Sequence, residues 1–171
     1  MAERGGGPSL AEAALFGVLG GLTFALKLAM AFLPNIEPVS LMVMLFAVTF
    51  GRRAAYPITV YVLLEFLVYG FGLWSFCYLY VWGVLALVAW LLRREEHPLA
   101  WALLSGGFGL SFGLLCAPVD LAVGGAAWAL SRWVSGIPFD LLHCAGNFAI
   151  ALALFTPLRT LMARLYQSVR R

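Results

Sequence analysis

The sequence predicts an all-α membrane protein, a bundle of six transmembrane helices with both termini in the cytoplasm. Apolar residues make up 63% of the 171 residues and charged residues 11%, and the mean hydropathy is +0.95. A soluble domain is roughly half apolar and a quarter charged, so a soluble fold is excluded. The apolar runs are continuous and do not alternate with polar residues, which excludes a transmembrane β-barrel and leaves helices.

The helices are located by the Pro, Gly and charged residues that separate the apolar runs, since each span needs about 20 mostly apolar residues. Pro34 and Pro38 close the first run, Gly51-Arg52-Arg53 closes the second, and charged residues from Arg93 close the fourth. Pro138 takes a favoured first-turn position in the last run. We expect a single transmembrane domain, 1–171, with spans at 11–33, 36–50, 55–71, 74–92, 98–117 and 138–158, an external connection over 118–137 and a basic cytoplasmic tail over 159–171.

Sidedness follows from the excess of Lys and Arg in cytoplasmic segments. Six spans place these basic residues inside: Arg4, Arg52, Arg53, Arg93, Arg94, Arg159, Arg164, Arg170 and Arg171. Only Arg132 lies outside, and Lys27 lies within the first span. The second run is short enough to be a re-entrant segment instead. Five spans with an external N-terminus would satisfy the charge rule almost as well.

With six spans, every ionisable group within the bundle lies in its outer half. Lys27 is near the outer end of the first span, Glu65 is about two turns deep in the third, and Asp140 and His143 are in the first turns of the last. A charge in hydrocarbon is costly, so each is a candidate for function. A channel needs polar groups along its whole path, and a stand-alone transporter usually has a site near the midplane. The pattern favours a capture site open to the outside.

Asp140, His143 and Asn147 are spaced i, i+3, i+7 and share one helix face. They either contact a ligand or form an interhelical hydrogen-bond cluster. A metal site is a further alternative, although one carboxylate and one histidine are few ligands for it. An intramembrane enzyme that uses Asp140 and His143 as an acid–base pair is also conceivable, but no nucleophile with a base is recognisable.

Other polar and aromatic candidates surround this stripe. Glu65 either binds a ligand or pairs with Lys27. Asn35 and Glu37, held between prolines, form either a binding lip or a solvated loop. Trp74 and Tyr78 either stack on a planar ligand or belong to an aromatic belt that faces lipid.

Small residues recur every four positions in the first span, at Gly17, Gly21, Ala25 and Ala29. Such a smooth stripe allows close helix approach, either inside the bundle or against another membrane subunit. Ser105, Gly109 and Gly113 repeat the pattern in the fifth span. Cys77, Cys116 and Cys144 stand singly in apolar context and are interpreted as packing residues.

Two segments, Leu33-Pro34-Asn35-Ile36-Glu37-Pro38-Val39-Ser40-Leu41 and Gly136-Ile137-Pro138-Phe139-Asp140-Leu141-Leu142-His143-Cys144-Ala145-Gly146-Asn147-Phe148, resemble S components of energy-coupling factor (ECF) transporters. The resemblance implies a six-helix protein that binds a vitamin near the outer surface of the bacterial cell membrane. It also implies a transmembrane coupling subunit and two cytoplasmic ATPases as partners, docked in part through the small-residue face of the first helix. The chain has no GxxxxGK[ST] motif, as the resemblance requires.

We therefore expect high-affinity capture of a vitamin or related small nutrient, with transport driven by the partner ATPases. The expected binding residues are Asn35, Glu37, Glu65, Trp74, Tyr78, Asp140, His143 and Asn147, and the expected docking residues are Gly17, Gly21, Ala25 and Ala29. Catalytic residues, metal ions, cofactors and nucleic acid are not expected. A structural or assembly subunit of the membrane is the main alternative.

Overall fold

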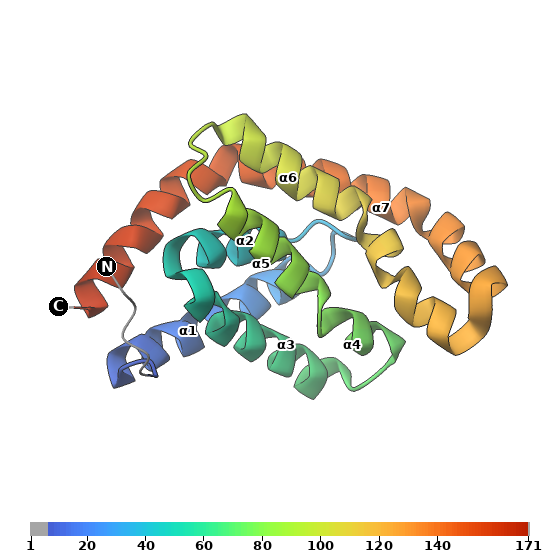
Figure 1. Cartoon of the computed structure of the whole chain (residues 1–171), viewed down its shortest axis with the longest axis horizontal. Coiled ribbons are helices and arrows are strands. Elements are labelled where there is room, and N and C mark those ends of the chain that lie inside the picture. The colour runs from blue at the N-terminus through green and yellow to red at the C-terminus, as the bar shows by residue number, and fades with distance from the viewer. Residues whose placement is uncertain (1–6, 171) are drawn as a thin grey trace.

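The computed structural model describes residues 7–170, and within that range the chain is helical and contains no strand. Arg4 and Arg171, two of the expected cytoplasmic basic residues, lie outside the described residues. The helices, drawn in Figure 1, are α1 (Leu10–Ala29), α2 (Val39–Phe50), the short 3-10 helix η1 (Gly51–Ala54), α3 (Ala55–Tyr69), α4 (Leu73–Tyr78), α5 (Val81–Leu91), α6 (Pro98–Leu110) and α7 (Phe112–Val169).

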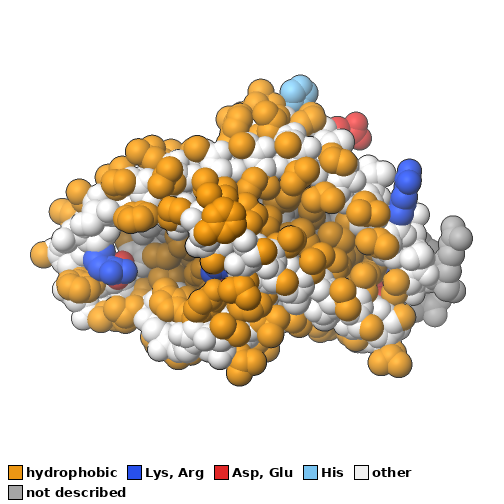
Figure 2. Space-filling view, turned by 180° about the vertical axis from the view of Figure 1, so that it is seen from behind, with side chains coloured by type: hydrophobic (Ala, Val, Ile, Leu, Met, Phe, Trp, Pro, Cys, Tyr) orange, Lys and Arg blue, Asp and Glu red, His pale blue; other side chains and the backbone are white. Residues whose placement is uncertain are grey.

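Four helical stretches of the described residues are long and apolar enough to cross a membrane: Leu10–Ala29, Val39–Tyr69, Leu73–Leu91 and Pro98–Val169. This confirms the prediction of an all-helical chain with several such stretches. The space-filling view agrees, because hydrophobic side chains cover most of the visible face and charged side chains occupy a few spots (Figure 2).

The bundle has two polar ends, which we name after the cations they hold. At the Arg53 end, Arg53 contacts Glu12 from the first turn of α1. At the Lys27 end, Lys27 from the last turn of α1 contacts Glu65 near the end of α3. The stretch Val39–Tyr69 therefore turns back at η1: α2 begins at the Lys27 end, and α3 returns to it (Figure 1).

Helix α2 forms the centre of the core. Ten of its twelve residues are buried, and it contains no charged residue. A helix that is apolar on every side is stable only when other helices surround it. At 1.5 Å per residue it is about 18 Å long, shorter than the roughly 30 Å hydrocarbon layer. Its neighbours, α1, α5, α6 and α7, shield it on several sides.

The region 118–137, predicted as a connection, is helical and belongs to α7. Two helical arms meet at Gly125, whose φ of 76° reverses the chain where an L side chain would be strained. Asp120 and Arg132 form an ion pair between the arms at 3.2 Å. Pro138 does not begin the last helix as expected, because the turn lies at Gly125 and the helix runs through Pro138.

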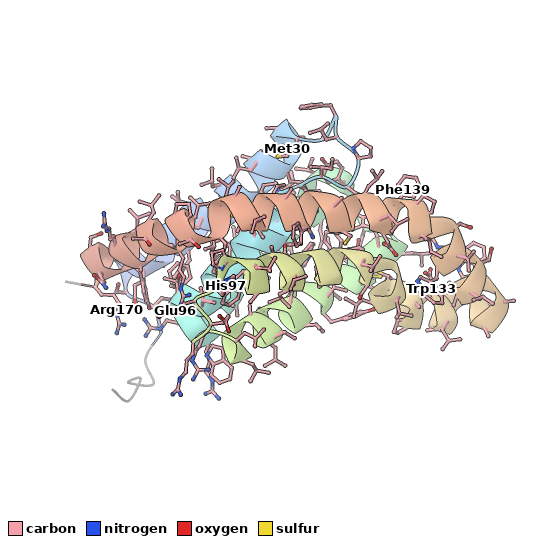
Figure 3. The ribbon with its side chains drawn as sticks, turned by 90° about the horizontal axis from the view of Figure 1, so that it is seen from above. Met30, Glu96, His97, Trp133, Phe139 and Arg170 are labelled. Atoms are coloured by element: carbon pink, nitrogen blue, oxygen red, sulfur yellow. The ribbon has the colours of Figure 1, made fainter. Side chains whose placement is uncertain are left out.

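The second arm of α7, from residue 126 to Val169, is about 66 Å long at 1.5 Å per residue, so it extends beyond the bundle (Figure 1). The labelled residues mark its direction: Arg170 lies at one end of the molecule with Glu96 and His97, and Trp133 lies toward the other (Figure 3). The predicted basic tail is part of this arm. Tyr166 packs on Phe50 with ring centroids 4.8 Å apart, which fixes the tail to the Arg53 end.

Candidate functional site

The polar core of the Lys27 end joins α1, α3, α4 and the loop before α2. Lys27 Nζ lies 2.8 Å from Glu65 Oε2 and 3.9 Å from Glu37 Oε2, and it donates a hydrogen bond to the Tyr78 hydroxyl at 3.3 Å. The Glu65 side chain is 1% exposed. A buried carboxylate needs a partner of this kind, since an isolated one costs several kcal/mol or more. We call Lys27, Glu37 and Glu65 the carboxylate–lysine group.

An aromatic cluster adjoins this group. It consists of Tyr61 (α3), Tyr78 (α4), Trp82 (α5), and Phe112 and His143 (α7). Successive rings are in contact: Tyr61 and Trp82 are 5.8 Å apart between centroids, Tyr78 and Trp82 5.3 Å, Trp82 and Phe112 5.9 Å, and Phe112 and His143 5.2 Å. Four helices thus converge on one set of rings beside a buried charge.

Unpartnered polar atoms concentrate in these two groups. Among the described residues, six buried side-chain oxygen or nitrogen atoms have no hydrogen-bond partner in the protein. Four of them belong here: Glu65 Oε1, Tyr61 Oη, Trp82 Nε1 and His143 Nε2. A buried polar atom without a partner costs about 1–3 kcal/mol. Together they comprise one acceptor, one donor and two groups able to do either, all without a partner in the protein.

The predicted Asp140–His143–Asn147 stripe is buried on one face of α7, as its spacing indicates. Its members have different neighbours, however. Both Asp140 oxygens accept the backbone N–H of Gly113, at 3.1 and 3.2 Å. Asn147 Nδ2 donates to Ser40 Oγ at 2.9 Å and to the Ser105 carbonyl at 3.3 Å. Only His143 adjoins the aromatic cluster, so the geometry gives Asp140 and Asn147 helix-packing contacts.

The loop residues Asn35 and Glu37 both lie at the Lys27 end. Asn35 has a positive φ of 57°, is exposed, and donates its amide to the Phe139 carbonyl at 3.3 Å. It therefore ties the loop to α7. Glu37 approaches Lys27, so the loop supplies the second carboxylate of the carboxylate–lysine group.

The predicted aromatic face is present even though the helix is interrupted between α4 and α5. Trp74 and Tyr78 are 5.0 Å apart between centroids, and Trp82 continues the same row. Trp82 is 1% exposed, which excludes it from a lipid-facing belt. The residues of this segment that expose apolar side chains are Leu73, Phe76 and Leu79.

The small-residue stripe of α1 faces away from the bundle. A Cβ atom placed on Gly17 or Gly21 meets no atom within 4 Å, and Ala25 and Ala29 are exposed. The helix uses Gly20 for internal packing, where a Cβ would lie 2.7 Å from the Pro57 carbonyl oxygen of α3.

The second small-residue stripe is internal. A Cβ on Gly109 would lie 2.8 Å from the His143 backbone, and one on Gly113 would lie 2.6 Å from the Asp140 carboxylate. These glycines allow α6 and the start of α7 to approach the second arm of α7. The two stripes therefore differ: the one on α1 is open, and the other is filled.

Several site residues were absent from the sequence-based set. Tyr61 and Phe112 look like ordinary core residues in the sequence, whereas Trp82 follows Tyr78 at the same four-residue step by which Tyr78 follows Trp74. Only the helix packing brings the three rings together. Glu12 was also missed, and it contradicts the expectation that every ionisable group within the bundle lies in its outer half: it is 5% exposed and contacts Arg53, Tyr166 and Arg170 at the Arg53 end. Its Ser9-x-x-Glu12 capping box is the one signal in the sequence that marks it.

Within residues 7–170, no three His, Cys, Asp or Glu side chains are grouped closely enough to hold a metal ion. The three cysteines are free. No protein family, curated protein or solved structure matches this chain.

Proposed function

We propose that this chain captures a small, ring-containing nutrient, such as a vitamin, at the Lys27 end of the bundle, which faces the outside of a bacterial cell. Partner ATPases, reached through a transmembrane coupling subunit, then drive uptake. The observation that carries the proposal is the convergence of four unpartnered buried polar atoms on an aromatic cluster beside a buried carboxylate. Ligand sites combine an apolar, aromatic lining with a few placed polar groups in this way.

The orientation is supported by the distribution of charge. Arg52, Arg53, Arg93, Arg94 and Arg159 lie at or near the Arg53 end, where Arg159 donates to the Arg93 and Glu95 carbonyls. Segments rich in Lys and Arg stay in the cytoplasm, so the Lys27 end would face outward.

The open stripe on α1 supports a membrane partner. Gly17 and Gly21 present bare backbone to the surroundings of the bundle, and such surfaces let another helix approach closely. The chain has no nucleotide-binding motif of its own, so a driven uptake would need ATPases in other subunits.

A structural or assembly role is the second candidate, and it has its own support. Asp140 and Asn147 direct their polar atoms to Gly113, Ser40 and Ser105 on neighbouring helices. In this candidate, the buried polar residues only hold the helices in register.

The two candidates are separated by purifying the chain in detergent and measuring binding of a panel of radiolabelled vitamins by equilibrium dialysis. Capture predicts that one member binds with a Kd below about 1 µM and is returned chemically unchanged. A panel without any binding, from a chain that unfolds cooperatively on heating, would favour the structural role.

A further inference from the structure

A cavity of about 560 Å³ lies between α3 and α5, apart from the carboxylate–lysine group. It begins at Gly51, Arg52 and Trp90 and continues to Phe66 and Tyr78. Along α3, the lining residues run from Ala55 to Phe66, about 17 Å at 1.5 Å per residue. The exposed side chains of Leu63, Leu79 and Leu87 also line it. The cavity is therefore a long groove that opens sideways, toward the surroundings of the bundle.

The lining of the groove is apolar along its length and charged at one end. Among residues 7–170, Arg52 is the only charged residue that lines the groove. It lies at the Arg53 end beside Trp90, whose indole nitrogen is 3.8 Å from a Cβ placed on Gly51. The Arg93 guanidinium lies over the same Trp90 ring, 4.4 Å from its centroid. One cation thus lines the groove, and a second lies over the ring of Trp90, which also lines it.

The length and the apolar lining of the groove fit a thin, flexible molecule. An acyl chain fits such a groove. It extends through one leaflet, which is about half of the roughly 30 Å hydrocarbon layer, and the groove is long enough to hold it. Basic pockets between transmembrane helices on the cytoplasmic side bind anionic lipid headgroups.

We propose that the groove between α3 and α5 binds an acyl chain of an anionic phospholipid whose phosphate lies against Arg52 and Arg93. The two guanidinium groups supply the positive charge, and Trp90 occupies the depth at which aromatic rings meet the headgroups. The site goes beyond nutrient capture and shares only Tyr78 and Trp82 with the aromatic cluster.

The test uses native mass spectrometry of the purified chain in detergent with added palmitoyl-oleoyl phosphatidylglycerol or phosphatidylcholine. We expect one phosphatidylglycerol to be retained at least tenfold more strongly than phosphatidylcholine. Arg52→Gln combined with Arg93→Gln should reduce that preference to twofold or less. Arg164→Gln, which changes an exposed arginine of α7 that does not line the groove, is the matched control and should keep the preference.

A second variant tests the groove itself. Gly83 lines it, and a Cβ there meets no atom within 4 Å, so Gly83→Leu fills the groove without a backbone clash. Leucine also favours the helix over glycine, so the variant should fold. We expect at least tenfold weaker retention of both lipids, whereas Gly107→Leu, at an open exposed position of α6, should behave as wild type. Equal retention of the two lipids by the wild type, or unchanged retention by Gly83→Leu, overturns the proposal.

Failure of this proposal is distinguishable from failure of nutrient capture. The affinity for the vitamin, whose proposed site is at the Lys27 end, is measured in parallel for the wild type and the lipid-site variants. Loss of phosphatidylglycerol preference with unchanged vitamin affinity would place the lipid at the groove alone, as proposed.

Discussion

Lys27 and Glu65 join the end of α1 to the end of α3 through an ion pair of 2.8 Å, and Glu65 keeps its second oxygen without a protein partner. The carboxylate is thus half satisfied by the protein. In the proposed function Glu65 has two tasks: it neutralises Lys27 within an apolar bundle, and its free oxygen would accept a hydrogen bond from a bound nutrient. The two tasks lead to separate measurements.

The first prediction concerns stability. Lys27→Met leaves the Glu65 carboxylate buried without its cation, so the free energy of unfolding should fall by about 3–5 kcal/mol. Lys27→Met combined with Glu65→Leu removes both charges and should recover most of that loss. Thermal and denaturant unfolding of the wild type, the two single variants and the double variant in detergent gives the coupling free energy between Lys27 and Glu65. Additive effects of the two single changes would show that the pair contributes nothing.

The second prediction concerns the open stripe of α1. Gly17→Leu and Gly21→Leu place side chains in open space, so we expect an unchanged melting temperature and unchanged vitamin binding by the purified chain. If a coupling subunit docks on this stripe, as proposed, uptake of the radiolabelled vitamin by cells should fall at least tenfold, because that subunit could no longer approach. Retention of uptake in both variants would remove the stripe from the docking surface.

Gly20→Leu is the matched control for those two variants. Its Cβ would lie 2.7 Å from both the Pro57 carbonyl oxygen and Val60 Cβ. Overpacking of this kind costs about 1–3 kcal/mol, so the melting temperature should drop. A variant one residue away from the stripe thus harms the fold, whereas the stripe variants harm only uptake.

The third prediction separates packing from ligand contact. Asn147→Ala removes the bonds to Ser40 and Ser105, and interhelical hydrogen bonds in membranes contribute about 0.6–2 kcal/mol. We expect a lower melting temperature with vitamin affinity within twofold of wild type. Trp82→Phe, which removes the unpartnered indole N–H, should weaken vitamin binding at least tenfold, and its melting temperature should fall as well because the smaller ring leaves a void in the core. A tenfold loss of vitamin affinity in Asn147→Ala would show instead that Asn147 contacts the ligand.

The fourth prediction concerns pH and the loop between α5 and α6. The backbone N–H groups of Glu96 and His97 donate to the Glu95 carboxylate and lower its pKa below the ordinary value of 4.5. A lowered carboxyl pKa stabilises the fold above the unfolded-state pKa, and this contribution is lost as the pH falls through the folded-state pKa. The stability advantage of wild type over Glu95→Gln should therefore be present at pH 7 and be lost as the pH falls below the ordinary carboxyl pKa of 4.5. An advantage independent of pH would contradict it.

Much of the fold could be predicted from the sequence, since apolar runs and their Pro, Gly and Arg boundaries locate α1, α2 and α3 to within a few residues. The region 118–137 could not. Pro118 and Pro138 suggest breaks, but the helix tolerates both, and the chain reverses at Gly125. Nothing local distinguishes Gly125 from Gly124, because the choice depends on how the two arms pack.

Site residues could be predicted only where their type is unusual for the surrounding sequence. Lys27 and Glu65 are charges within apolar runs, so the sequence marks them as candidates. Tyr61, Trp82 and Phe112 are aromatic residues among many, and only the packing of α3, α5 and α7 places their rings in contact. Asp140 and Asn147 carry the same polar signal whether they bind a ligand or a neighbouring helix, so the sequence leaves that choice open.

The most direct measurement of nutrient capture is the Kd of the vitamin found by the panel, compared between wild type, Glu65→Gln and Glu12→Gln. Both carboxylates are buried and paired with a cation, but at opposite ends of the bundle. A hydrogen bond to a charged group contributes about 1.5–3 kcal/mol, which is roughly a 10- to 150-fold change in Kd. Nutrient capture at the Lys27 end predicts that loss for Glu65→Gln and a wild-type Kd for Glu12→Gln. Equal affinities in all three proteins, or greater loss at Glu12, would contradict it.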